Sequence, residues 1–308
     1  MSLGEDYMVI DFHLHVGDFR LMGREDREPM TWENQLARLD DEGIDMAVFL
    51  PVYNTSPEGC PFPMLYDDRA CLRDQVVDAG LYPDRIIPFG NMDPRWGSNT
   101  PRTDFAPILD WFQAHGCRGV GEITANVAFD DPRNVNMFRQ LGERGMLVTI
   151  ESCVFGEGHY GYQDDPGLPH LERLLQLAPD TTVIGHGPGF WANMAAITTV
   201  EQMSGYPKGP IPREGAVSRL LRDYPNMYAD TSAGSGWNAL TRDPDFGIAF
   251  LNEFQEKILF GTDVCFADEA GRAPQLGYLK RLLAEGKLSR TAYDKIASGN
   301  GLRLLGMA

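Results

Sequence analysis

Short apolar runs alternate with amphipathic segments along the whole chain. Glycine, proline, asparagine or aspartate bounds each run, as expected for parallel strands that helices cover on their outer face. The pattern therefore predicts eight buried strands. We expect them at Met8–Phe12, Met46–Leu50, Ile86–Gly90, Gly119–Ile123, Leu147–Ile150, Thr182–Ile184, Met227–Ala229 and Ile258–Phe260.

The segments between these runs carry apolar residues at helical spacing, such as Leu36 and Leu39. We expect helices at Trp32–Glu42, Phe105–Ala114, Asn134–Arg144, Leu168–Leu177, Ala216–Arg222 and Phe246–Gln255, and again toward the C-terminus. Eight strand–helix alternations in 308 residues favour a closed barrel over an open sheet. The first strand is not followed by the Gly-x-Gly-x-x-Gly motif of dinucleotide-binding folds. We therefore predict an α/β fold, a (β/α)8 TIM barrel, with residues 1–308 in a single domain.

Four long loops follow predicted strands. They are Pro51–Pro63, Asn91–Thr103, Ser152–Gly167 and Gly185–Arg213. A TIM barrel builds its active site from the loops that follow the C-terminal ends of its strands. We therefore expect any chemistry of this chain to lie at that end of the barrel.

Composition and charge limit the classes of partner and the compartment that we expect. The net charge of −17 argues against nucleic acid or an anionic membrane surface as the main partner, because both need a basic face. Neither a signal peptide nor an apolar run long enough to span a membrane is visible. The five cysteines are scattered without a Cys-x-x-Cys pair, which is typical of reduced thiols. We expect a cytoplasmic protein that acts on a small molecule.

The first predicted strand ends in the sequence IDFHLH, residues 10–15. Side chains at i and i+2 of a strand point the same way, so His13 and His15 are expected to share one face. At the mouth of a barrel that face is the interior, where two neutral imidazoles form half of a metal site. The pattern alone is also compatible with two solvated or capping histidines.

The last predicted strand runs into FGTD, residues 260–263. In a closed barrel the last strand pairs with the first, so Asp263 should arrive beside His13 and His15. There its carboxylate could bind a metal and take a proton from water. The alternative is that Asp263 caps a helix.

A third histidine, His186, lies just after the predicted strand Thr182–Ile184, within the sequence IGHGPGFW, residues 184–191. The flanking glycines leave space for a ligand, so this histidine suits a metal ligand or a general acid/base. The alternative is a buried structural histidine.

Together, IDFHLH, IGHGPGFW and FGTD resemble the amidohydrolase superfamily, in order and over nearly the whole chain. More narrowly they are similar to its amidohydrolase-related branch, which includes aminocarboxymuconate semialdehyde decarboxylase. The resemblance implies a divalent metal, usually zinc and sometimes manganese, with one or two ions per chain. It implies His13, His15 and Asp263 as ligands and His186 as the histidine of the sixth barrel strand.

The chain departs from the family at the fifth predicted strand. The family commonly has a metal-binding histidine there, whereas the sequence LVTIESC, residues 147–153, offers Glu151. Glu151 could bind the metal, support another ligand, or act as an acid or base. His159 in the following loop could supply an imidazole instead, although a surface position is the simpler interpretation.

The fourth predicted strand contains another carboxylate, Glu122, in an otherwise apolar run. A buried carboxylate is costly unless it is paired or bound to a metal. In the superfamily this strand often supplies a carboxylate that bridges two metals, so Glu122 is a further candidate ligand. A salt bridge to Arg118 or Arg95 is the alternative.

The resemblance leaves more than one reaction open. We expect hydrolysis of an amide, ester or lactone of a small polar molecule, with Asp263 accepting a proton from water and His186 bonding the developing oxyanion. The alternative is nonoxidative decarboxylation of a small unsaturated or aromatic acid. A metal-free binding protein on the same fold is a second alternative.

Residues in the loops after the strands are candidates for contact with the substrate. Arg95 could clamp a carboxylate, and Trp96, Trp191 and Trp237 could line a pocket. Each tryptophan could equally be packing. A homo-oligomer, a dimer or a larger assembly, is expected from what such barrels often form, although no motif identifies an interface.

Overall fold

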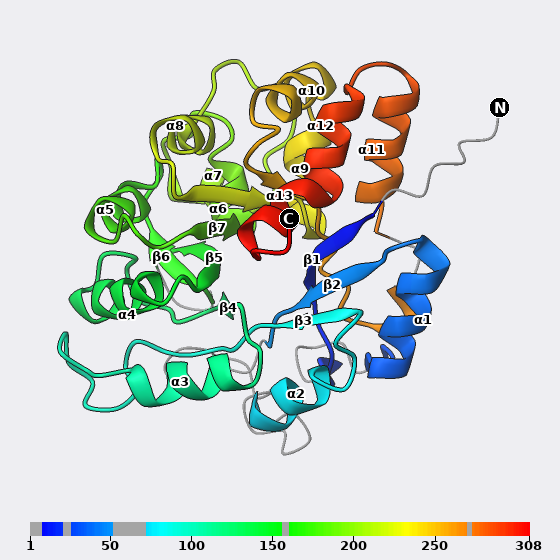
Figure 1. Ribbon diagram of the computed structural model, residues 1–308. Helices are drawn as coiled ribbons and strands as arrows, with labels where there is room; N and C mark the ends of the chain where they lie inside the picture. Colours follow the sequence, from blue (N-terminus) through cyan, green and yellow to red (C-terminus); the bar gives the residue numbers. More distant parts are fainter. Residues whose placement is uncertain (1–7, 21–25, 52–71, 156–159, 270–272) are drawn as a thin grey trace.

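The computed structural model describes residues 8–20, 26–51, 72–155, 160–269 and 273–308. Within these ranges, parallel strands stand in barrel order with helices around them, which confirms the predicted TIM barrel (Figure 1). The barrel strands are β1 (Ile10–Leu14), β2 (Met46–Phe49), β3 (Ile86–Pro88), β4 (Gly119–Ile123), β5 (Leu147–Val154), β7 (Val183–His186), β8 (Met227–Asp230) and β9 (Ile258–Leu259). A further strand, β6 (Tyr162–Asp164), pairs in parallel with the end of β5.

Helices follow most of the strands. They are α1 (Trp32–Glu42), α2 (Leu72–Ala79), α3 (Ala106–Ala114), α4 (Pro132–Glu143), α5 (Pro169–Leu177), α6 (Pro188–Ala192), α7 (Val200–Met203), α8 (Ala216–Asp223), α9 (Ala233–Thr241), α10 (Pro244–Glu253), α11 (Gln275–Ala284), α12 (Arg290–Asp294) and α13 (Asn300–Leu304), with the short 3-10 helix η4 (Ala267–Glu269) and the π-helix η5 (Lys295–Gly299). No helix in the described part of the chain is long and apolar enough to cross a membrane.

Local signals set the helix ends. The Thr31 side chain accepts a hydrogen bond from the backbone of Asn34 and starts α1, and Gly43 ends it with a φ of 68°. The six predicted helices all form, with bounds within two residues of those expected. The pattern did not predict α2, α6, α7 and α9.

The barrel strands fall into two sheets, β1-β2-β3 and β4-β5-β7-β8-β9. Two narrow seams close the ring. At the seam between β1 and β9, the backbone N–H of Asp263 donates to the carbonyl of His13 at 2.8 Å. At the seam between β3 and β4, Gly90 donates to Gly119 at 2.9 Å. The first and last strands are therefore neighbours, as the closed barrel requires.

The barrel interior is filled by its own apolar cluster. Residues from the strands, among them Phe12, Val48 and Leu259, pack there together with Leu305, which follows α13. Leu305 belongs to the C-terminal segment, whose Met307 lies beside the start of β3. The C-terminal segment therefore covers the end of the barrel where strands begin and leaves the opposite end to the site.

The structure corrects two of the predicted loops. β5 continues to Val154, because its last residues pair with β6, so the loop expected at Ser152–Gly167 begins inside a strand. The segment Gly185–Arg213 contains α6 and α7. Polar residues at the end of β5 hid the strand from an apolar pattern. Of Pro51–Pro63, all but the first residue lies outside the described residues.

Candidate metal centre

Histidine and carboxylate side chains converge where the barrel strands end, and we call them the strand-end cluster. Its members are His13, His15, Glu122, Glu151, His186, Asp230 and Asp263. Six of these residues are buried, whereas the Asp263 side chain is 21 % exposed. The cluster therefore lies inside the barrel mouth with one carboxylate facing outward.

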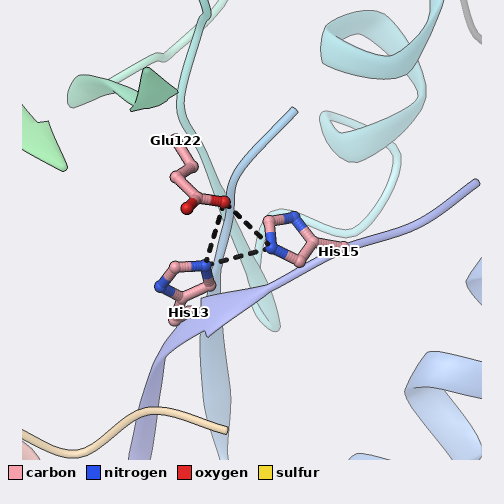
Figure 2. A group of neighbouring side chains, drawn as sticks. All are labelled: His13, His15 and Glu122. Carbon is pink, nitrogen blue, oxygen red and sulfur yellow. Dashed lines mark hydrogen bonds and ion pairs between the residues drawn. The ribbon is translucent and has the colours of Figure 1, made fainter. Parts of the chain in front are cut away.

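His13 of β1 and His15, the residue after β1, face each other as their spacing predicted (Figure 2). Their Nε2 atoms are 3.0 Å apart. His15 Nδ1 donates to the carbonyl of Leu50 at 2.7 Å, and His13 Nδ1 lies 2.9 Å from Asp230 Oδ2. With the proton of each neutral ring on Nδ1, each Nε2 presents a lone pair to the cluster. Metal-binding histidines are held in this way.

Two predicted carboxylates reach the histidine pair. Asp263 Oδ1 lies 2.9 Å from His15 Nε2 and 3.6 Å from His13 Nε2. Glu122 Oε2 lies 3.7 Å and 3.8 Å from the same two atoms. The alternative salt bridges of Glu122 do not form, because Arg118 is exposed before β4 and Arg95 is bound to Asp93.

Glu151 and His186 complete the other side of the cluster. They are partners in the β5–β7 ladder, and Glu151 Oε2 lies 3.5 Å from His186 Nε2. Two glycines leave the space that the Glu151 side chain occupies. A Cβ atom on Gly187 would overlap the Glu151 carboxylate, and one on Gly161 would lie 2.6 Å from Glu151 Cγ. His159, the alternative donor, lies outside the described residues.

The sequence interpretation missed Asp230, which ends β8. Its Oδ2 contacts His13 Nδ1, and its Oδ1 lies 3.0 Å from His186 Nδ1 and accepts from the backbone of Ser232. One carboxylate thus orients two imidazoles. Its signal in the sequence was available, because Asp230 directly follows the predicted strand Met227–Ala229, and Asp263 was recognised from a similar position three residues after the last strand.

The close packing of charges shifts several pKa values. Burial raises the pKa of Glu151, and the neighbouring Glu122 charge adds to this. Burial also raises the pKa of Glu122, but hydrogen bonding to His13 and the charges of His186 and His13 outweigh it and hold that pKa far below its usual range. Burial lowers the pKa of His13, yet Asp230 raises it well above its usual value. The cluster therefore holds protons at neutral pH in the absence of another cation.

The donor set fits a divalent metal ion. Four groups of three side chains have donor atoms within 4.8 Å of one another: His13, His15 and Glu122; His13, His186 and Asp263; His15, Asp263 and Cys265; and Glu122, Glu151 and His186. Two ligands of one ion are roughly 3–3.5 Å apart for bonds of about 2.1 Å. Mixed imidazole and carboxylate donors suit zinc or manganese. A bound ion would replace the protons on the side chains that bind it.

A cavity of about 290 Å³ opens beside the cluster. Asp263 and Trp237 line it together with Arg27, Glu269 and Gln275. This places one of the predicted substrate contacts, Trp237, in a cavity that reaches the cluster.

The other predicted substrate contacts have different surroundings. Trp191 is buried, and its indole donates to the carbonyl of Asp230 at 3.1 Å. Trp96 packs partly buried against the core. Arg95 bonds Asp93 and the carbonyl of Ala125. The Trp191 geometry supports the packing alternative, and a substrate contact by Trp96 or Arg95 stays a prediction.

Comparison with known proteins extends these findings. The family model described as Amidohydrolase matches residues 10–307. No curated protein matches the sequence.

Solved structures share the fold across almost the full chain. The 5-carboxyvanillate decarboxylase of Sphingomonas paucimobilis is 15% identical and has a TM-score of 0.58, with 98% of this chain and 100% of that chain covered. A dihydroxybenzoic acid decarboxylase of Polaromonas sp. JS666, with bound manganese and the inhibitor 2-nitroresorcinol, is 14% identical with a TM-score of 0.58, covering 98% and 97%. A Pseudomonas putida protein assigned as a 2-pyrone-4,6-dicarboxylic acid hydrolase is 14% identical with a TM-score of 0.57, covering 98% of each chain.

Proposed function

Because the chain belongs to the amidohydrolase family, we propose that it is a metal-dependent hydrolase of an amide, ester or lactone bond in a small polar molecule. The position of Asp263 is the observation that carries the proposal. Asp263 is the one member of the strand-end cluster whose side chain is more than a tenth exposed, and it lines the cavity. Burial raises its pKa, but the bond to His15 and the charges of His13 and His15 lower it by more. Asp263 is therefore an ionised base at the edge of a small cavity.

His13, His15 and Asp263 would hold a divalent ion, with Glu122, Glu151 and His186 in reach, and such an ion would supply Lewis acidity to water and to a carbonyl group. The residues of the chain supply the proton transfers. Asp263 takes the proton of the attacking water. As the bond to the leaving nitrogen or oxygen breaks, Asp263 returns that proton to the leaving atom.

His186 stabilises the charge that develops on the carbonyl oxygen. Its Nδ1 is bound to Asp230, so its Nε2 faces the cluster. Burial lowers the pKa of His186, but the charge of Asp230, its hydrogen bond and the charge of Glu122 together raise that pKa above its usual value, which favours the protonated ring. A hydrogen bond to a developing oxyanion is worth about 10²–10³ in rate.

Decarboxylation of a small aromatic or unsaturated acid is the second candidate, and Glu151 favours it. Burial and the Glu122 charge raise the pKa of Glu151, so its carboxyl group keeps a proton beside His186. Such a group can protonate the carbon from which carbon dioxide leaves. Two of the similar structures are decarboxylases.

Metal content tests the common premise of both reactions. We expect elemental analysis of the purified protein to give about one or two zinc or manganese ions per chain. Asp263→Asn should lose metal, and Asp268→Asn, which changes a residue of η4 that pairs with Arg27 outside the strand-end cluster, should not. If Glu151→Gln also loses metal, Glu151 is a ligand. If the wild-type chain binds no metal even after reconstitution, the enzyme proposal fails and a binding protein on this fold is favoured.

Products separate the two reactions. The metal-loaded protein should release acid from lactones or esters, which a pH indicator follows, or amine from amides, which an amine reagent detects, and it should release no carbon dioxide from hydroxybenzoic acids. Asp263→Asn should lower the rate at least about 100-fold. Release of carbon dioxide with no hydrolysis would reverse the order of the two candidates.

A further inference from the structure

A buried ionic network lies behind the strand-end cluster and outside it. Arg38 of α1 and Asp11 of β1 form an ion pair with Nη2 and Oδ2 2.9 Å apart, and both side chains have 0% exposure. The second Asp11 oxygen, Oδ1, accepts from the backbone N–H of His13 at 3.1 Å and of Thr262 at 2.9 Å. One carboxylate therefore joins the backbones of β1 and the segment after β9, directly beside two candidate ligands.

A second arm of the network reaches the far side of the same ligands. Arg38 Nε donates to Gln35 Oε1 at 2.7 Å. Gln35 Nε2 donates to the carbonyl of His15 at 2.7 Å and to that of Val264 at 3.1 Å. The two arms thus bind the backbone on both sides of the His13–His15 segment and on both sides of Asp263.

The Thr262 hydroxyl links the two arms. It donates to Asp11 Oδ2 at 2.6 Å, and Arg38 Nη1 lies 3.3 Å from it. Asp263 itself has a φ of 60°, a backbone conformation that a residue other than glycine rarely adopts. Such a conformation persists when its surroundings fix it, and here the residues before and after Asp263 are both held.

Stability does not explain this network. Removing an arginine and a carboxylate from water costs about as much as their attraction returns, so a buried ion pair is weak support for a stabilising role. The network also lies at the β1–β9 seam, where an isolated bridge, Leu14 with Val264, replaces a continuous ladder. The relative position of the His13–His15 pair and Asp263 is therefore set by these side chains together with two backbone hydrogen bonds across the seam, from Phe12 to Phe260 and from Asp263 to His13.

We propose that Arg38 and Asp11 are positioning residues for metal binding, which act through Thr262 and Gln35 to fix the His13–His15 pair against Asp263. The inference rests on the proposed function, because it takes these three residues as ligands. Arg38 bonds Asp11 and Thr262, which are not members of the strand-end cluster. Asp11 reaches the cluster only through the backbone N–H of His13. The network binds no ion. It fixes the relative positions of the side chains that would bind the ion.

Cobalt(II) titration of the metal-free protein tests the proposal, because the visible spectrum of cobalt reports the geometry of its ligands. We expect Arg38→Met and Asp11→Asn to weaken cobalt affinity about 10- to 100-fold and to change the spectrum of the bound ion. Thr262→Val keeps the side-chain volume and leaves no charge unpaired, so it should fold where Arg38→Met does not. It should produce the same spectral change with a smaller loss of affinity.

Asn300→Ala is the matched control. Asn300 is buried and donates to the carbonyls of Gln255 and Ile258, so it holds the opposite end of β9. Urea unfolding should show that this variant is less stable, while its cobalt affinity and spectrum match the wild type. Arg38→Lys, which keeps the charge, should restore part of the affinity.

Three outcomes separate the inference from its premise. Wild-type protein that binds no cobalt contradicts the proposed function and this inference together. Wild-type binding with unchanged affinity and spectrum in both Arg38→Met and Thr262→Val contradicts this inference alone. An Asn300→Ala variant that loses affinity as much as Thr262→Val would show that general loosening, and not positioning, is responsible.

Discussion

His13 Nδ1 lies 2.9 Å from Asp230 Oδ2, although 217 residues separate the two side chains in the sequence. The contact fixes the tautomer of His13 and the direction in which its Nε2 points. Because Asp230 also contacts His186, one buried carboxylate sets two of the imidazoles in the cluster.

We predict that Asp230→Asn lowers metal affinity about 10- to 100-fold, because outer partners of ligating histidines have effects of this size. An asparagine can donate from one side, so one of the two rings would lose its acceptor. Competition with a chelator would measure the affinity. Asp223→Asn, on the exposed side of α8, is the control. Equal affinities for both variants would show that Asp230 does not orient the rings.

Gly187→Ala tests whether Glu151 belongs to the metal centre. The added Cβ would overlap the Glu151 carboxylate, and Gly187 has a φ of 90°. Gly167→Ala is a matched control, because Gly167 has a φ of 96° and nothing within 4 Å of the added Cβ. Both variants should lose about 1–2 kcal/mol of stability from backbone strain. Only Gly187→Ala should also lose metal, as elemental analysis would show, and equal metal contents would place Glu151 outside the centre.

Trp237 should contribute to substrate binding more than to the chemical step. We expect Trp237→Leu to raise KM about tenfold with a change in kcat below about threefold, since Trp237 lines the cavity without joining the strand-end cluster. Steady-state kinetics with a lactone or ester substrate would measure this. Trp111→Leu, on α3 and stacked on His115, should leave both constants unchanged. A large fall in kcat alone would contradict the assignment.

The ion pair between His170 and Asp130 should make stability depend on pH. Burial lowers the pKa of His170, but the hydrogen bond to Asp130 and the charge of Asp164 raise it by more, to above 6.5. A histidine whose pKa is higher in the folded chain stabilises the fold below its unfolded pKa, and the contribution is lost as pH rises through the folded pKa. Both side chains are part-exposed, at 29% and 30%, so the effect should be at most about 1 kcal/mol.

Urea unfolding of the wild type and Asp130→Asn, from about pH 5.5 to about pH 9, would measure this difference. The two free energies of unfolding should differ at the acidic end and converge at the alkaline end. A difference that grows with pH would have the opposite sign to the one expected.

The sequence was informative where burial and chemistry coincide in a short segment. All eight barrel strands follow from apolar runs, and the His13–His15 pair follows from period-two geometry at the end of one of them. Asp263 could be placed because barrel closure brings the last strand to the first. These inferences need only local pattern and one topological rule.

The remaining features depend on which side chains meet in three dimensions. Trp191 and Trp237 follow strands in the same way, yet one bonds the Asp230 backbone and the other lines the cavity. As a charged residue on an amphipathic helix, Arg38 would be expected at the surface. Its side chain is instead buried, because Asp11 and Thr262 supply partners from distant segments. Pairing of this kind has no signature in the spacing of residues.

The division of the barrel into two sheets has a consequence for assembly. His13 belongs to the three-stranded sheet and His15 directly follows its strand β1, whereas Glu122, Glu151 and His186 belong to the other sheet and Asp263 lies four residues after the end of its strand β9. An ion bound by both groups would act as a cross-link between the two parts of the barrel. Folding and metal uptake would then be linked by mass action, and the free energy of unfolding would rise by RT ln(1 + [metal]/Kd). The stability of the closed barrel would thus depend on the concentration of available metal.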